Sequence, residues 1–67
     1  MDAFNMTEQE RVALAQSLVQ VGTVIQTTVS SGLAFTAYVR DAASLYTVRV
    51  SCVTMQIVGQ ATGVSVA

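Results

Sequence analysis

Charged residues are so few and so unevenly placed in this chain of 67 residues that two long segments carry no charge. Residues 12–39 form the first uncharged segment, and residues 50–67 form the second. Charged residues make up 10% of the chain, whereas an ordinary globular domain has about 25%. Hydrophobic residues make up 52%. Most of this chain must therefore be buried against something.

The composition excludes several classes of protein. A disordered chain is polar and charged, and this one is neither. Three arginines against four acidic residues do not form a basic face for nucleic acid. One cysteine, Cys52, cannot form a disulfide framework. We find no nucleophile–base pair, metal-ligand cluster or phosphate loop, so the sequence predicts no enzyme, no cofactor and no catalytic or metal-binding residue.

The length limits how much surface one copy can bury. A chain of this size buries only about 60% of the surface that its unfolded form exposes. Disulfides, a metal or self-association usually compensate. With one cysteine and no histidine, self-association is the remedy that the sequence offers. We therefore expect a single domain, residues 1–67, whose partner is another copy of itself.

Membrane association is an alternative that the first uncharged segment raises. Its 28 residues could span a bilayer. However, it contains Gln16, Gln20 and Gln26, which a lipid-facing helix rarely carries. The acidic start lacks the positive region of a signal peptide, and a lone thiol fits a reducing compartment. We expect a cytoplasmic protein, or one inside a virion or cytoplasmic assembly.

A helix start is the clearest local signal. Thr7 and Glu10 have the spacing of a capping box, in which each side chain bonds the backbone N–H of the other residue. Apolar residues then follow at helical steps of three and four, through Leu14, Leu18, Val21 and Ile25. This pattern predicts a helix over about residues 8–29.

A second helix is predicted over about residues 33–58. Its apolar positions again recur every three or four residues, and Gly59 is suited to end it. These positions are Phe35, Val39, Ala42, Tyr46, Val50, Val53 and Ile57. The fold predicted is all-α, with two helices packed into a homo-oligomeric assembly.

The same segment also fits strands. Val, Thr and Ile total 22 of the 67 residues, and these favour strands. The alternative is therefore α+β, an N-terminal helix followed by a three-stranded meander. We favour helices for two reasons. Small residues between the bulky ones allow close helix packing, and a meander with so little charge leaves its edges unprotected.

Arg49 stands out among the polar residues. It lies within an apolar, β-branched stretch, and a buried arginine there needs a carboxylate such as Asp41 of another copy. The candidates for a subunit interface combine this residue with the apolar positions of both predicted helices. They are Leu14, Leu18, Val21, Ile25, Phe35, Val39, Tyr46, Arg49, Val53 and Ile57.

Residues 25–39 resemble the central segment of the R-body (refractile body) killing-trait proteins, which are small and rich in Ala, Val, Thr and Gln. Residues 54–58 are similar to the downstream Thr-Gln-x-Val region of that family. Arg40 and Asp41 replace the Gln-rich run that the family has after its central segment. The resemblance implies assembly into large insoluble ribbons in the bacterial cytoplasm, without catalysis.

The sequence thus predicts a structural protein that forms a homopolymeric ribbon, filament or shell by burying apolar faces between copies. A small subunit or anchor of a membrane complex is the first alternative. A small dimeric binding module is the second.

Overall fold

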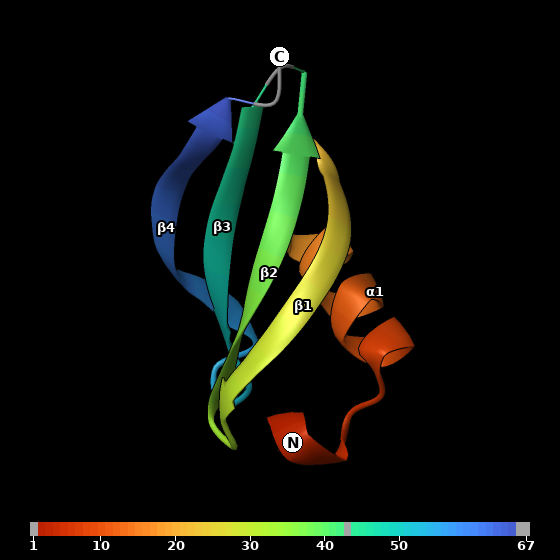
Figure 1. Ribbon diagram of the computed structural model, residues 1–67. Helices are drawn as coiled ribbons and strands as arrows, with labels where there is room; N and C mark the ends of the chain where they lie inside the picture. Colours follow the sequence, from red (N-terminus) through yellow and green to blue (C-terminus); the bar gives the residue numbers. More distant parts are fainter. Residues whose placement is uncertain (1, 43, 66–67) are drawn as a thin grey trace.

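One α-helix and four antiparallel strands make up the fold in the computed structural model (Figure 1). The structure describes the backbone of residues 2–42 and 44–65, and the side chains of residues 2–42 and 44–61. The elements are η1 (Ala3–Asn5), α1 (Glu8–Leu18), β1 (Thr23–Ser31), β2 (Ala34–Asp41), β3 (Ser44–Ser51) and β4 (Gln56–Ser65).

The predicted start of the first helix is confirmed, but its predicted end is wrong. The Glu10 N–H donates to Thr7 Oγ1 at 3.1 Å, and the Thr7 N–H donates to Glu10 Oε1 at 2.8 Å. The helix ends at Leu18 rather than near residue 29. Gly22 then has a φ of +103°, which a right-handed helix cannot include. The β-branched residues that follow pair with β2 instead.

The second predicted helix is also wrong, and with it the all-α fold. The described residues between positions 33 and 58 form β2, β3, the start of β4 and the turn that precedes β4. The protein is therefore α+β and mainly sheet rather than helical, as in the alternative but with four strands instead of three. Positions four residues apart share a face in a strand as well as in a helix. Phe35 and Val39 accordingly lie on one face of β2, opposite Val50 and Tyr46 of β3.

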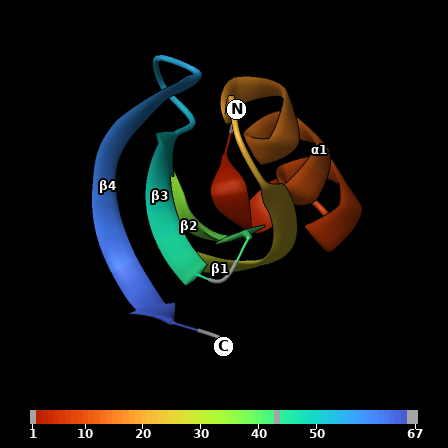
Figure 2. The same ribbon diagram turned by 90° about the horizontal axis from the view of Figure 1, so that it is seen from above.

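The sheet is a meander in which each strand pairs with the next, in the order β1-β2-β3-β4. The register shifts at two points along each outer strand, and Ile25 in β1 and Val58 in β4 are the extra residues at one of the two. Bulges bend a strand and increase its twist. The sheet curls accordingly, and α1 lies inside the curl on the side of β1 (Figure 2).

The core lies between α1 and the concave face of the sheet. Its largest fully buried side chains are those of Phe35, Val39, Val48, Val50 and Cys52. Helix α1 packs against β1 and β2, so the concave face of β3 and β4 is covered less completely. Within residues 2–42 and 44–65, no helix has the length and apolarity needed to cross a lipid bilayer.

Candidate functional site: an open sheet edge and a groove

The two edge strands of the sheet differ in how their backbones are covered. At the β1 edge, side chains of α1 bond the strand directly. The Val24 N–H donates to Gln16 Oε1 at 2.8 Å, and Gln16 Nε2 donates to the Gly22 carbonyl at 3.1 Å. Gln16 therefore occupies backbone groups through which another strand could otherwise pair with β1.

Glu8, the first residue of α1, covers another part of the same edge. Its carboxylate accepts hydrogen bonds from the Thr27 N–H at 2.9 Å and from the Thr27 hydroxyl at 2.7 Å. Arg11 contacts both residues, at 2.8 Å from its Nε to Thr27 Oγ1 and 2.8 Å from its Nη2 to Glu8 Oε1. The hydrogen bond from the Thr27 side chain, with help from Arg11, lowers the pKa of Glu8 below its ordinary value. The charged form of Glu8 is thus the one that closes the edge.

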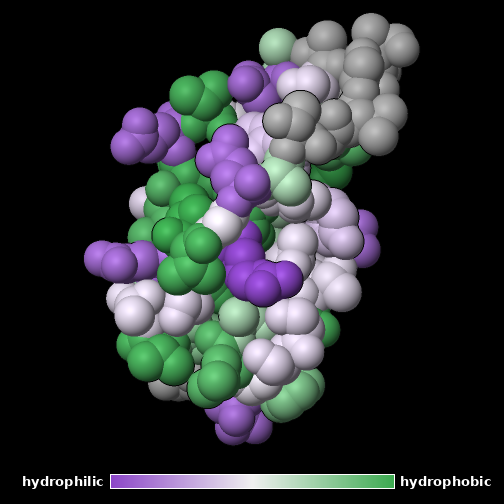
Figure 3. Space-filling view, turned by 90° about the vertical axis from the view of Figure 1, so that its left-hand side faces the viewer, coloured by the Kyte–Doolittle hydropathy of each residue, from purple (hydrophilic) through white to green (hydrophobic). Residues whose placement is uncertain are grey.

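The β4 edge has no comparable cover. Strand β4 pairs with β3 alone among the strands, and no described side chain forms a hydrogen bond with its backbone. Residues 56–65 contain no charge and no proline, the features that commonly prevent edge strands from pairing. Figure 3 views the molecule from this side, and hydrophobic and weakly polar surface occupies much of the face.

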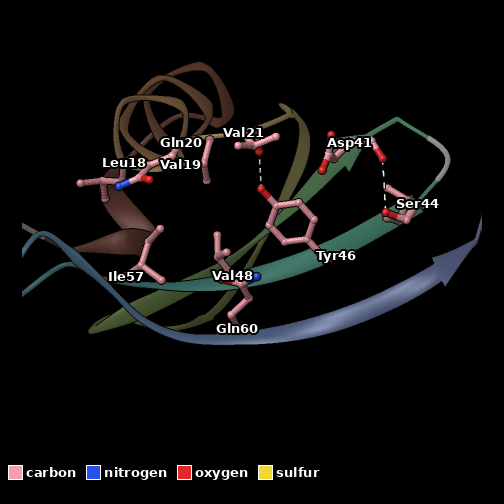
Figure 4. Close-up of a pocket in the computed structure, with 11 residues that line it drawn as sticks. Leu18, Val19, Gln20, Val21, Asp41, Ser44, Tyr46, Val48, Ile57 and Gln60 are labelled. Atoms are coloured by element: carbon pink, nitrogen blue, oxygen red, sulfur yellow. Dashed lines mark hydrogen bonds between the residues drawn. The ribbon is translucent and has the colours of Figure 1, made fainter.

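A groove of about 490 Å³ opens beside β4, where α1 leaves the concave face of the sheet uncovered (Figure 4). Its lining comes from the end of α1, the segment leading to β1, and strands β2 to β4. The lining residues are Leu18, Val19, Gln20, Val21, Asp41, Ser44, Leu45, Tyr46, Val48, Ile57 and Gln60.

The groove has an apolar end and a polar end. Leu18, Val19 and Ile57 lie at one end in Figure 4, whereas Asp41 and Ser44 lie at the other. Asp41 is the one charged residue among the described residues that line the groove. The groove thus presents apolar side chains at one end and a single acidic residue at the other.

Tyr46 lines the groove between these two ends, and a hydrogen bond holds its side chain in place. Its hydroxyl donates to the Val21 carbonyl, so β3 is bonded to the segment that connects α1 to β1. The phenol ring borders the same groove as Asp41 (Figure 4). Because the hydroxyl is already bonded, the ring is held in place before any ligand arrives.

Arg49 lies on the opposite, convex face of the sheet. It is exposed, pairs with Thr36 of β2 and Gly59 of β4, and borders a hollow of about 210 Å³. Arg11–Glu8 is the one ion pair found among the described residues. Asp41 borders the concave groove instead, so the structure does not bring these two predicted partners together within one chain.

The other interface candidates fall into three groups. Phe35 and Val39 are fully buried inside the chain's own core. Leu14, Leu18, Tyr46 and Ile57 are half-buried against that core. The exposed candidates, apart from Arg49, are Val21, Ile25 and Val53.

Sequence reasoning missed the open edge and the charged groove. The missing charge in residues 56–65 was visible in the sequence, but it signals an open edge only once β4 is known to be a strand. Asp41 joins the groove because the fold places residues 18–21, Ile57 and Gln60 along the same hollow, which no local motif encodes. In the parts of the chain that the structure describes, no three acidic, cysteine or histidine side chains gather as metal ligands would.

Comparisons with protein-family models, curated proteins and solved structures found no match to this chain. The resemblance of residues 25–39 to the R-body proteins therefore stays a prediction.

Proposed function

We propose that this protein is a structural, non-catalytic self-assembling protein whose copies pair through β4. The contrast between the two sheet edges carries the proposal. Glu8 and Gln16 close the β1 edge with hydrogen bonds, whereas β4 has no strand on its outer side and no described side chain bonds its backbone. An uncovered edge strand is a template for another strand.

A second copy of the chain is the partner that suits this edge. Two β4 strands related by a two-fold axis run antiparallel, so the same backbone groups are offered by both copies. The pairing extends each four-stranded sheet into one sheet twice as wide. The strands bring no like charges together, because residues 50–67 have none. A net charge of −1 also gives the copies little mutual repulsion.

Growth beyond a pair requires a second contact, and one end of the molecule offers a surface for it. Exposed apolar side chains gather there from η1 and from the β1–β2 and β3–β4 turns. The Ala3 N–H donates to the Gly32 carbonyl at 3.0 Å, and the Cys52 N–H donates to the Leu33 carbonyl at 2.7 Å, which brings the three segments together. We call this surface the apolar end; it consists of Phe4, Leu33, Val53 and Met55.

Exposed apolar clusters commonly mark protein contacts. Edge pairing through β4 combined with packing at the apolar end would generate a ribbon or filament. We place this assembly in the cytoplasm, because Cys52 is a free thiol and suits a reducing compartment.

Matched lysine substitutions, one at a bulge of each edge strand, test the proposal. Val58 of β4 is 57% exposed, and Ile25 of β1 is 47% exposed. Each is an extra residue at a register shift in an edge strand. A lysine at either position can reach water without disturbing the core, but only the one in β4 lies on an open edge. Sedimentation of each variant across a range of concentrations measures the association.

We expect wild-type protein and Ile25→Lys to associate equally, and Val58→Lys to sediment as a monomer. Circular dichroism of all three should show the same secondary structure. A monomeric wild-type protein at high concentration would overturn the proposal. Equal association of Val58→Lys and wild-type protein would show that β4 is not the contact.

A further inference from the structure

We infer that the groove beside β4 is a binding site for a small amphiphilic cation, an alkyl or aryl body that carries one ammonium group. The inference is independent of self-assembly, because the groove lies on the concave face of the sheet, and pairing through β4 would extend the sheet at its edge. It depends on three features of the groove: its size, its polarity and its single charge.

The size suits a small organic molecule. Sites for small ligands usually measure about 300–1,000 Å³, and the groove measures about 490 Å³. They are lined mainly by apolar side chains with a few polar groups that set orientation. Leu18, Val19 and Ile57 provide such an apolar surface here, and Gln20 and Gln60 add amides at its borders.

The charge selects a cation. Asp41 is the one acidic or basic residue among the described residues that border the groove. No described side chain forms an ion pair with it, and the one hydrogen bond that Asp41 forms with a side chain uses its backbone carbonyl, which accepts from the Ser44 hydroxyl at 3.2 Å. Within residues 2–42 and 44–61, no hydrogen bond or ion pair occupies its carboxylate. A charged hydrogen-bond donor would bind this carboxylate more strongly than a neutral donor does.

The same end of the groove favours an organic cation over a metal ion. A divalent metal needs several oxygen or nitrogen ligands, and Asp41 is the only carboxylate beside the groove in the described part of the chain. The ring of Tyr46 borders this end too, and aromatic faces attract ammonium groups. An ammonium group would lie between Asp41 and Tyr46, with its apolar body toward Leu18 and Ile57.

Three probes of equal chain length test this assignment on the wild-type chain: octylammonium, 1-octanol and octanoate. Backbone amide shifts in two-dimensional NMR locate each probe and give its dissociation constant. We expect octylammonium to shift amides of residues 18–21, 44–48 and 57–60, and to bind at least about tenfold more tightly than octanol. Octanoate should bind most weakly, because its charge repels that of Asp41.

Matched variants identify the charge responsible. Asp41→Asn should weaken octylammonium binding about tenfold, whereas Glu10→Gln should leave it unchanged. Both changes remove one negative charge, and glutamine at position 10 preserves the capping box. Val58→Lys should bind octylammonium as wild-type protein does, because Val58 does not line the groove. A failure of edge pairing would therefore not affect this result.

Three results would overturn the inference. Equal affinity for octanol and octylammonium would show that the ammonium charge does not contribute to binding. Shifts outside the groove would place the site elsewhere, and an unaltered affinity in Asp41→Asn would exclude Asp41 as the recognising group. The comparison of probes needs no variant, so it decides the question even if a substitution unfolds the chain.

Discussion

Glu8 on the first turn of α1 accepts two hydrogen bonds from Thr27 in β1, one from the backbone N–H and one from the hydroxyl. This pair joins residues 19 positions apart in the sequence. It leaves Thr27, a polar residue with 6% of its surface exposed, with its hydroxyl satisfied. It also occupies a backbone group at the edge of β1, so the same contact supports the fold and obstructs pairing at that edge.

The pKa of Glu8 predicts how stability depends on pH. The hydrogen bonds from Thr27 favour the charged carboxylate, so the pKa is lower in the folded chain than in the unfolded one. The stabilisation is complete above the unfolded-state pKa of about 4.3. It is lost as the pH falls through the lower folded-state value. We expect acidification to lower the free energy of unfolding more in wild-type protein than in Glu8→Gln.

Chemical denaturation between about pH 6 and pH 3 measures this difference, since that window brackets the titration of an ordinary carboxylate. Glu10→Gln is the control, because it removes a carboxylate whose hydrogen-bond partner is Thr7 rather than a residue of β1, and it keeps a capping residue at that position. Parallel pH dependence in wild-type protein and Glu8→Gln would contradict the prediction.

Gln16 should contribute to stability through the β1 edge. Gln16→Ala leaves the Val24 N–H and the Gly22 carbonyl without their partner. We expect a loss of about 1–2 kcal/mol, the range for an unsatisfied backbone group that water reaches only in part. Gln9→Ala is the control on the same helix, because Gln9 is exposed and should tolerate the change. Denaturation midpoints of the two variants give the comparison, and equal values would argue against the edge contact.

Gly22 should not tolerate a side chain. Its φ of +103° disfavours any other residue, and a Cβ there would lie 2.7 Å from Val39 Cγ1 and 2.8 Å from the Arg40 carbonyl oxygen. Gly22→Ala should therefore cost more than about 1 kcal/mol. In Gly59→Ala the new Cβ would lie 3.9 Å from Arg49 Cβ, an ordinary contact. Thermal melts should show a clear loss for the first variant and a change below about 0.5 kcal/mol for the second.

Cys52 should react with thiol reagents only when the chain opens. It is 2% exposed, and burial shields a thiol from attack. We expect Ellman's reagent to label the native protein slowly and the denatured protein at once. The double variant Cys52→Ala/Val53→Cys moves the thiol to a position that is 69% exposed and should be labelled quickly without denaturant. Rapid labelling of native wild-type protein would show that the core around Cys52 opens readily.

The sequence by itself determined the start of α1 and the scarcity of charge. Thr7 and Glu10 form a capping box because both partners lie within one turn, so their spacing alone specifies the geometry. The alternation of Phe35, Ala37 and Val39 was also readable as a strand with one buried face, which the structure has. Both signals depend on residues close together in the chain.

The tertiary structure decided where α1 ends and which segments form strands. Phe35 and Val39 share a face whether the segment is a helix or a strand, so periodicity could not distinguish a helix from a strand here. Pairing of Phe35 with Val50 and of Val39 with Tyr46 settles the choice. The open edge of β4 and the groove beside Asp41 likewise depend on contacts between distant residues, because a strand becomes an edge only through the placement of its neighbours.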